Sequence, residues 1–426
     1  MAFKQAMAAF ALATTVLMPV TAPLLAQDTH SVENPAALGF DPVALADLDN
    51  HLDTLAAAGA RPGYAAIIAR GEQIAFLSEA GEADLDNHAP FTVDTPVRIA
   101  SMTKPVTAVA IMMLVERGEI ALHDPVSDYI PSFANVRVAV SPMANEAGEI
   151  ETRAPDTVMT IEHLLTHTAG LGYIFEAESD LGRLYLENSM YDGEGDLAFR
   201  VDRLTAMPLY TDPGERWMYS YGLDVAGRVI EVVSGMPLNT FFDTEIFTPL
   251  GMNSTGFFFE DVDFSEDELA PLYIHDEDGA MVPFEFGTPT WPSGGGGLVS
   301  TASDYIRFAM LLANGGQLGD VELMSQETFA IFSSPHATGD QLGEGWDGRA
   351  FALAMDVVLP PEEGQRPAGV PGDLSWGGLF DTDFFVSPRT GTAAVIMTQI
   401  QPSQYRPEPR TLREFRPRVY ASFAFD

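Results

Sequence analysis

The chain has 426 residues, of which 46% are hydrophobic and 10% aromatic, so it can bury a large core in one large domain or two interleaved domains. Its formal net charge of −39 disfavours binding to nucleic acid and to anionic membranes. The chain has no cysteine, which excludes disulfides, thiolate nucleophiles and thiolate metal sites.

Residues 1–26 have the pattern of a signal peptide. The segment contains Lys4, an apolar run from Ala6, and Leu24-Leu25-Ala26 as a small-residue cleavage site. We therefore expect export to a periplasm or to the medium. A membrane span is the minor alternative, because prolines interrupt the run. No later segment has 18 uninterrupted apolar residues, so no membrane span is expected in the mature chain.

The remaining elements follow from hydrophobic periodicity and from turn residues. We expect helices at 41–55, 101–117, 160–168, 224–233, 236–247, 302–314 and within 412–423, and strands at 63–69, 73–77, 350–358, 383–387 and 392–399. Strands near both chain ends enclose a helical middle, which predicts an α+β fold: an antiparallel sheet built from both ends and flanked by helices, with a mostly helical insertion. The expected segments are 1–26 (signal peptide), 27–125, 126–289 (mostly helical) and 290–426.

One lysine is unusual. Of the 22 basic residues only Lys4 and Lys104 are lysines, so Lys104 is the only lysine after the leader. Arginine cannot lose its proton in a protein whereas a buried lysine can, which indicates chemistry that needs a neutral amine. Ser101 lies one turn earlier on the same face of the expected helix 101–117, where free N–H groups and the helix dipole favour an oxyanion. The alternative is a capping serine with a snorkelling lysine.

Other polar patterns give weaker signals. His163 and His167 have an i,i+4 spacing that a metal could use, but no acidic residue completes a zinc-protease helix, so structural roles are favoured. The acidic run at 259–280 is interpreted as a solvated face rather than a Ca²⁺ site. Gly294–Gly297 is expected to be a flexible run, because no P-loop lysine follows it. We predict no metal and no cofactor.

Several stretches together resemble the serine β-lactamase and penicillin-binding superfamily, most closely its family VIII carboxylesterases, which are similar to class C β-lactamases. In chain order the stretches are Ser101-Met102-Thr103-Lys104, His163–Leu171, Pro213-Gly214-Glu215 with Tyr219-Ser220, Pro249–Met252, Gly296–Thr301 and Trp376-Gly377-Gly378. Each is weak alone, but the ordered set over about residues 40–400 is specific.

The resemblance implies a role for each matching residue. Ser101 would be the nucleophile, Lys104 the general base, and Tyr219 the proton relay to the leaving group. The backbone N–H groups of Ser101 and Leu379 would form the oxyanion hole. The implied partner is a small-molecule ester; no pattern specifies an oligomeric state.

Two departures from the family pattern bear on the substrate. The second motif of lactamases and peptidases is Tyr-x-Asn, but Tyr221 stands at its third position. The third motif usually carries Lys, but Trp376 takes that place. Both changes weaken recognition of β-lactams and of D-Ala-D-Ala and fit neutral, apolar esters. We expect Tyr221, Trp376, Gly377 and Gly378 to contact the substrate; Arg389 or another arginine is the candidate for a replacement cation.

The leading interpretation is an exported serine carboxylesterase for short-chain acyl or aryl esters. The alternatives are a β-lactamase or D-Ala-D-Ala peptidase-like hydrolase, and a non-catalytic ligand-binding protein on the same fold. The last would predict damage at Ser101, Lys104 or Tyr219, and none is present. The chain has no Gly-x-Ser-x-Gly, so a strand-to-helix nucleophile elbow is unsupported.

Overall fold

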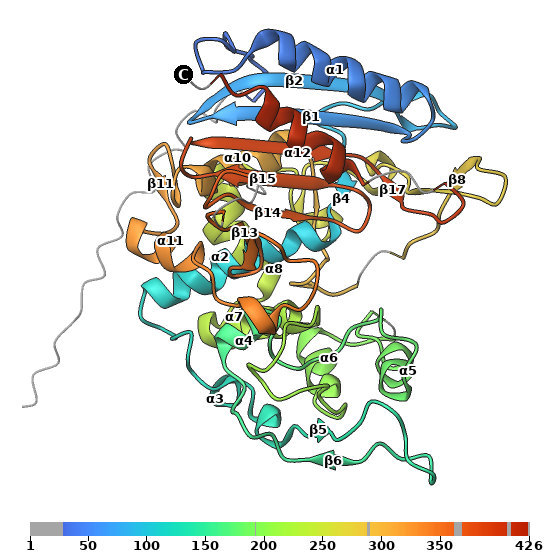
Figure 1. Cartoon of the computed structure of the whole chain (residues 1–426), viewed down its shortest axis with the longest axis vertical. Coiled ribbons are helices and arrows are strands. Elements are labelled where there is room, and N and C mark those ends of the chain that lie inside the picture. Colours follow the sequence, from blue (N-terminus) through green and yellow to red (C-terminus); the bar gives the residue numbers. More distant parts are fainter. Residues whose placement is uncertain (1–28, 192, 288–289, 362–368, 407–409, 425–426) are drawn as a thin grey trace, which may run out of the picture.

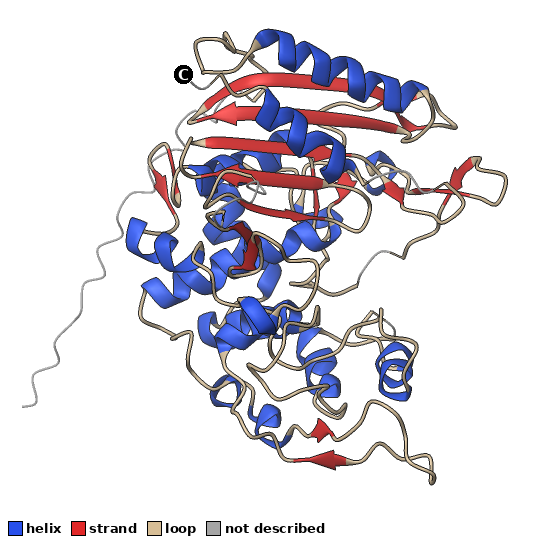
Figure 2. Cartoon of the chain, viewed as in Figure 1, coloured by secondary structure: helices blue, strands red, loops and turns tan. Residues whose placement is uncertain are grey.

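The structure is a computed structural model, and it describes residues 29–191, 193–287, 290–361, 369–406 and 410–424. The expected signal peptide, residues 1–26, lies outside the described residues. The central feature is an eight-stranded sheet in the order β12-β13-β14-β15-β16-β1-β2-β3 (Figures 1 and 2). Its strands are β1 Gly63–Arg70, β2 Gln73–Asp84, β3 Ala89–Pro90, β12 Arg349–Phe351, β13 Asp356–Val358, β14 Leu374–Gly377, β15 Asp383–Ser387 and β16 Thr392–Met397.

Both ends of the chain build this sheet. The first strand, β1, pairs antiparallel with β16, from Ala65 opposite Met397 to Arg70 opposite Thr392. The other strand pairs in the sheet are antiparallel too. The α+β class predicted from the sequence is therefore confirmed.

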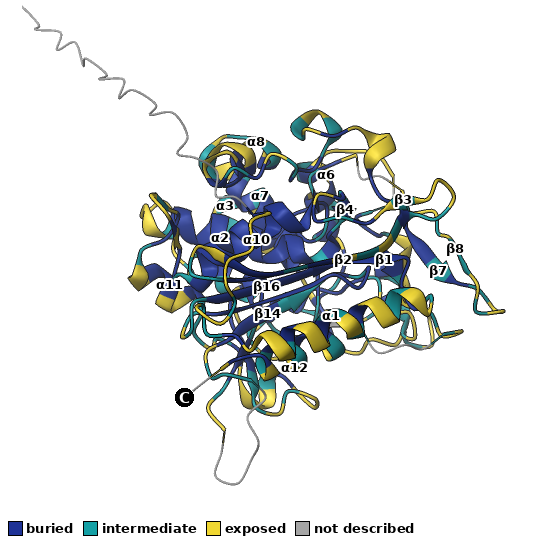
Figure 3. Ribbon diagram, turned by 90° about the horizontal axis from the view of Figure 1, so that it is seen from above, coloured by how far each residue is buried: buried dark blue, intermediate teal, exposed yellow. Residues whose placement is uncertain are grey.

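Helices cover both faces of the sheet, as Figure 3 shows. Helices α1 (Pro42–Ala57) and α12 (Thr411–Ala421) lie on one face, and α10 (Ala302–Ala313) and α2 (Thr103–Glu116) belong to the opposite layer. Side chains alternate along β1: Ala66 and Ile68 pack in the cluster of α1 and α12, whereas Ile67 packs in the larger cluster that includes α2 and α10. Because both faces are covered, β1 is a nearly continuous apolar run.

The middle of the chain carries most of the remaining helices, with short strand pairs between them. The helices are α3 Val126–Tyr129, α4 Ile161–Leu165, α5 Asp180–Glu187, α6 Leu197–Leu204, α7 Gly222–Ser234, α8 Leu238–Phe242, α9 Thr248–Leu250 and, later in the chain, α11 Gln326–Phe332. The short strands are β4 Val97–Arg98, β5 Val138–Ala139, β6 Thr152–Arg153, β7 Tyr273–His275, β8 Met281–Pro283, β9 Val299–Ser300, β10 Gln317–Leu318, β11 Val321–Glu322 and β17 Ile400–Gln401. None of the described helices is long and apolar enough to span a membrane.

One expected strand is wrong. The apolar run 350–358 is not a single strand but the hairpin of β12 and β13. Ala354 adopts a left-handed backbone (φ 62°) in the turn, and its N–H donates to the carbonyl of Leu165 at 2.9 Å. The apolar run contains none of the residues that usually mark a turn, so nothing in the sequence indicated the hairpin. In the structure a hydrogen bond to a distant segment accompanies the turn.

Candidate active site

Ser101 lies in a short 3₁₀ turn, Ala100–Met102, which leads directly into α2. The preceding Ala100 has a φ of 45°, a strained conformation for a residue with a Cβ. A hydrogen bond fixes the start of this turn: the N–H of Ile99 donates to the carbonyl of Leu298 at 3.1 Å, next to the pairing of β4 with β9. The sequence correctly predicted Ser101 at a helix N-terminus, but the strain before it has no sequence signal.

Lys104 is completely buried one turn into α2. Its Nζ lies 3.3 Å from Ser101 Oγ and donates to the carbonyl of Gly295 at 2.5 Å. The amine also lies 4.6 Å from the centre of the Tyr219 ring. A snorkelling lysine would carry its amine to solvent, so burial excludes that alternative.

Tyr219 reaches the same point from the turn before α7, with its hydroxyl 2.6 Å from Ser101 Oγ. Its ring packs against His167, with 4.6 Å between ring centroids, and against Trp376 at 6.0 Å. The structure thus brings Tyr219 to the Ser101–Lys104 pair, although Tyr219 lies 118 positions after Ser101 in the chain. Their arrangement is that of a nucleophile with two proton-transfer groups beside it.

The His167 ring packs against the Tyr219 ring, and His167 is completely buried. Burial, and next the charge of Lys104, lower the pKa of His167 well below its usual value. Its Nδ1 accepts the N–H of Ser220 at 3.2 Å. The neighbouring His163 instead completes a capping box with Thr160. In the described part of the chain no three metal-ligating side chains are grouped together.

The third motif lies at the end of strand β14, beside Ser101. Trp376, Gly377, Gly378 and Leu379 line the same cavity as Ser101. Gly378 must be glycine, because a Cβ there would lie 2.4 Å from the carbonyl of Ile99 and 2.2 Å from Thr382 Oγ1. This close approach brings the Gly378–Leu379 segment next to the turn that carries Ser101.

The cavity at Ser101 has a volume of about 580 Å³, within the size range of small-molecule sites. Seven of the 19 residues in its wall are aromatic and come from distant parts of the chain: Tyr173, Phe175, Tyr191, Tyr219, Phe286, Trp376 and Phe380. Phe175 and Phe286 are also partly exposed to solvent. The wall therefore favours apolar or aromatic ligands.

Tyr221 does not line this cavity, so the expected substrate contact is corrected. The residue is fully buried, and its hydroxyl lies 3.2 Å from Ser189 Oγ. Its ring packs behind the cavity wall, 4.6 Å from the Tyr173 ring and 6.0 Å from the Tyr191 ring. The ring of Tyr221 therefore belongs to the core behind the cavity wall and not to the surface that a ligand would contact.

The candidate cation is also corrected. Arg389 is exposed in the turn between β15 and β16, away from the residues that line the cavity. Two other arginines line the cavity, Arg410 and Arg416. Arg410 bonds Asp381, Nε to carboxylate at 3.2 Å, and Arg416 bonds Asp383 at 2.7 Å. Carboxylates of the protein therefore already engage both cations.

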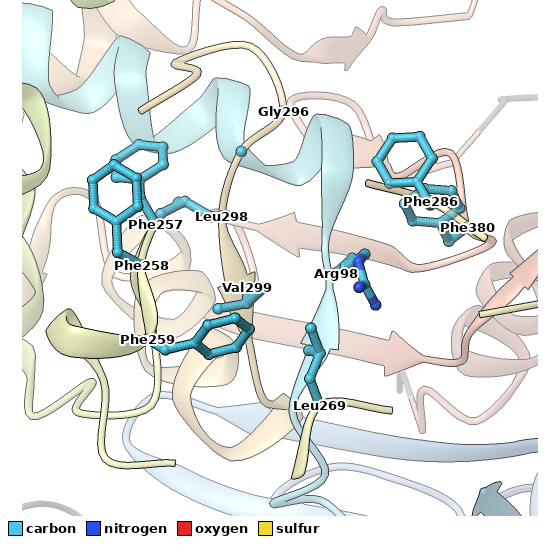
Figure 4. A pocket seen from close by; sticks show the side chains of 11 residues that line it. Arg98, Phe257, Phe258, Phe259, Leu269, Phe286, Gly296, Leu298, Val299 and Phe380 are labelled. Atoms are coloured by element: carbon cyan, nitrogen blue, oxygen red, sulfur yellow. The ribbon is translucent and has the colours of Figure 1, made fainter. Parts of the chain in front are cut away.

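A second, much smaller cavity of about 20 Å³ adjoins the first and shares Phe286, Gly296 and Phe380 with it. Figure 4 shows Phe257, Phe258 and Phe259 on one side of this space and Arg98, Phe286 and Phe380 on the other. Its volume suffices for about one water molecule. We assign no ligand to it.

Sequence reasoning missed most of the cavity wall. Tyr173 and Phe380 each lie two positions after a recognised stretch, so proximity could have suggested them. Tyr191 and Phe286 lie in segments without a motif, and only the fold places them beside Ser101.

Comparisons with known proteins identify the family. The sequence model of the Beta-lactamase family matches residues 48–415, so the chain belongs to this family. The chain is 32% identical to Esterase EstB of Burkholderia gladioli over 389 residues, covering 86% of this chain and 93% of EstB. It is 33% identical to Protein Rv1367c of Mycobacterium tuberculosis over 357 residues, covering 80% and 86%.

Among solved structures, the chain is similar to EstCE1, described as a hydrolase with promiscuous acyltransferase activity. The TM-score is 0.71 at 26% identity, and the match covers 89% of this chain and 99% of EstCE1. The β-lactamase-like fold expected from the motifs is confirmed.

Proposed function

We propose that the protein is an exported serine carboxylesterase that hydrolyses short-chain acyl or aryl esters through an acyl-enzyme on Ser101. One observation carries the proposal: Ser101 Oγ, in the wall of an aromatic cavity, lies 2.6 Å from the Tyr219 hydroxyl and 3.3 Å from Lys104 Nζ. The similarity to Esterase EstB over most of both chains supports it.

In acylation, Ser101 Oγ attacks the ester carbonyl as its proton passes to the neutral amine of Lys104, directly or through Tyr219. The N–H groups of Ser101 and Leu379 hold the oxyanion of the tetrahedral intermediate. The intermediate then collapses: the bond to the alkoxide breaks, and Tyr219 delivers the proton to the leaving alcohol. A water molecule repeats these steps on the acyl-enzyme and releases the acid.

The cavity wall supports the choice of neutral esters over β-lactams. Trp376 presents an aromatic face where a lactamase would present a cation, and Tyr221 presents no amide to the cavity. Arg410 and Arg416 are engaged by aspartates. A substrate carboxylate would have to displace these protein carboxylates, at the cost of leaving a buried charge unpaired.

The test compares p-nitrophenyl butyrate with nitrocefin, recording initial rates and the intact mass of the protein after each exposure. We expect fast ester turnover, slow or no nitrocefin turnover, and a butyryl adduct that Ser101→Ala abolishes. Fast nitrocefin turnover would instead favour the β-lactamase alternative. If the protein shows no turnover of either compound and forms no adduct, the binding-protein alternative is favoured.

A second candidate activity is transfer of the acyl group to an alcohol. The specific observation is the cavity volume of about 580 Å³ with its aromatic wall, which has room for an aromatic acceptor beside a butyryl group. Vinyl butyrate with added 2-phenylethanol tests this: phenylethyl butyrate should form alongside butyrate. Formation of butyrate alone would restrict the activity to hydrolysis.

The export part of the proposal rests on the apolar leader, residues 1–26. Expression of the full chain in a bacterium with a periplasm tests it. We expect the protein in the periplasmic or medium fraction with a mass that lacks the leader. Full-length protein in the cytoplasm would contradict it.

A further inference from the structure

Asp224 is a buried carboxylate that the mechanism above does not use. It lies in the first turn of α7, five positions after Tyr219, and is fully buried. Its Oδ1 accepts the hydroxyl of Ser293 at 2.6 Å and the N–H of Gly295 at 3.1 Å. Its Oδ2 is buried and has no hydrogen-bond partner among the described residues. A carboxylate in such surroundings costs free energy, so its presence calls for a role.

The glycine run connects Asp224 to Lys104. The N–H of Gly295 points to Asp224, while the carbonyl of the same residue accepts the amine of Lys104 at 2.5 Å. The carbonyl of Gly294 is held separately by Thr107 Oγ1 at 2.7 Å. Hydrogen bonds from Lys104 and Thr107 and to Asp224 therefore fix Gly294 and Gly295. This corrects the expectation that Gly294–Gly297 is a flexible run.

The glycines permit this close packing. A Cβ on Gly295 would lie 2.5 Å from Asp224 Oδ2, and a Cβ on Gly294 would lie 2.6 Å from the carbonyl of Leu223. The Asp224 carboxylate thus lies directly against the Gly295 peptide, whose carbonyl bonds Lys104. A side chain at position 295 would push the carboxylate away from this peptide.

The charge of Asp224 also matters. Burial raises its pKa, and hydrogen bonding from Ser293 and then the charge of Lys104 oppose that rise. Within the described part of the chain Lys104 makes no direct ion pair with a carboxylate. An ammonium formed there during acylation has little water to stabilise it, so a nearby negative charge is worth more than at the surface.

The other titratable groups around this pair stay neutral over an ordinary assay range. Burial lowers the pKa of His167 well below its usual value, and burial raises the pKa values of Tyr173 and Tyr191 well above theirs. Asp224 is therefore the group of this cluster that can carry a negative charge opposite Lys104.

We propose that Asp224 is a positioning residue for acyl transfer: it fixes the Gly295 carbonyl that orients Lys104, and its charge offsets the charge that Lys104 gains on taking the Ser101 proton. This inference rests on the proposed esterase function. The proton that Lys104 accepts as the Ser101 Oγ–carbon bond forms returns to the leaving alcohol as the ester C–O bond breaks. The ammonium is transient, and Asp224 itself gains no proton.

The test separates charge from geometry. Asp224→Asn keeps an acceptor oxygen toward Ser293 and Gly295 but removes the charge. An amine without its counter-charge is a weaker base and loses its proton at lower pH. We expect plateau kcat/KM for p-nitrophenyl butyrate to fall on the order of tenfold. The acid limb of its pH profile should move to lower pH by about one unit.

The matched control is Asp304→Asn in α10, another buried aspartate. Its carboxylate accepts the N–H of Ser254 at 2.8 Å and the hydroxyl of Thr255 at 2.9 Å, and no bond joins it to the glycine run or to Lys104. This variant should change the melting temperature while keeping the wild-type plateau and acid limb. An unmoved limb in Asp224→Asn, or an equal loss in both variants, would overturn the proposal.

A second variant guards against misfolding. Ser293→Ala removes one hydrogen bond to Asp224 but leaves the carboxyl group in place. It should lower kcat/KM severalfold; a wild-type rate would refute the positioning role. The proposed function fails in a different way, since wild-type protein would then show neither ester turnover nor an acyl adduct.

Discussion

Replacing Lys104 with arginine tests the neutral-amine argument most directly. The amine is completely buried, 3.3 Å from Ser101 Oγ and 2.5 Å from the carbonyl of Gly295. Arginine keeps the positive charge and the donor capacity but cannot lose its proton. Positioned general bases contribute about 10²- to 10⁴-fold to rate. At 1.36 kcal/mol per tenfold, Lys104→Arg should therefore raise the acylation barrier by about 3 to 5 kcal/mol.

The larger guanidinium also overpacks the site, at a cost of about 1–3 kcal/mol of folding stability. Thermal unfolding should therefore accompany kinetics on p-nitrophenyl butyrate with active-site titration. Lys104→Met serves as the matched control, because it fills similar space without charge or proton transfer. Both variants should be folded and nearly inactive. An arginine variant within tenfold of the wild type, beside an inactive methionine variant, would show that charge alone suffices and refute the neutral-amine mechanism.

Three further predictions concern the tyrosine, the oxyanion hole and a buried acid. Tyr219→Phe keeps the ring packing but removes the hydroxyl 2.6 Å from the nucleophile, so kcat should fall about 10²- to 10⁴-fold with little change in stability. Gly378→Ala would place a Cβ 2.4 Å from a backbone carbonyl and displace the Leu379 amide, so kcat should fall about 10²- to 10³-fold; Gly377→Ala, whose contacts are 3.1 Å and longer, should lose far less. Burial raises the pKa of Asp304 to about 6, so its stabilising contribution is complete below about pH 4 and is lost as the pH rises through 6. Relative to the wild type, Asp304→Asn should therefore gain about 3 kcal/mol of stability between pH 4 and pH 7.

These predictions have clear contrary outcomes. A Tyr219→Phe variant with wild-type kcat would remove the tyrosine from proton transfer. Equal losses in Gly377→Ala and Gly378→Ala would mean that the position of the Leu379 amide is not what matters. For Asp304, denaturant unfolding at several pH values is the measurement, and a pH-independent difference between variant and wild type would contradict the raised pKa.

The relative position of Ser101 and Lys104 could be predicted because it is local. Ser101 and Lys104 are one helical turn apart, so a helix fixes their relation whatever the rest of the fold does. The scarcity of lysine then points to the amine. Tyr219 needed the family resemblance, since only the tertiary structure carries it across 118 positions to Ser101.

The cavity wall could not be predicted in the same way. Tyr221 was expected to contact substrate because it occupies a motif position, yet it turns into the core behind Tyr173. Arg389 was the named replacement cation, but Arg410 and Arg416 line the cavity because α12 packs on the sheet beside β15. Neither Arg410 nor Arg416 lies near a motif that would mark it as a cavity residue.

The sequence by itself predicted the closeness of Ser101 and Lys104, the α+β class and the pairing of both chain ends in one sheet, because these follow from helical spacing and strand periodicity. The tertiary structure alone decided which aromatic side chains line the cavity, and that the Gly295 peptide connects Asp224 to Lys104. Those relations depend on side-chain orientation and on contacts between segments far apart in the chain, and packing of the whole molecule sets both.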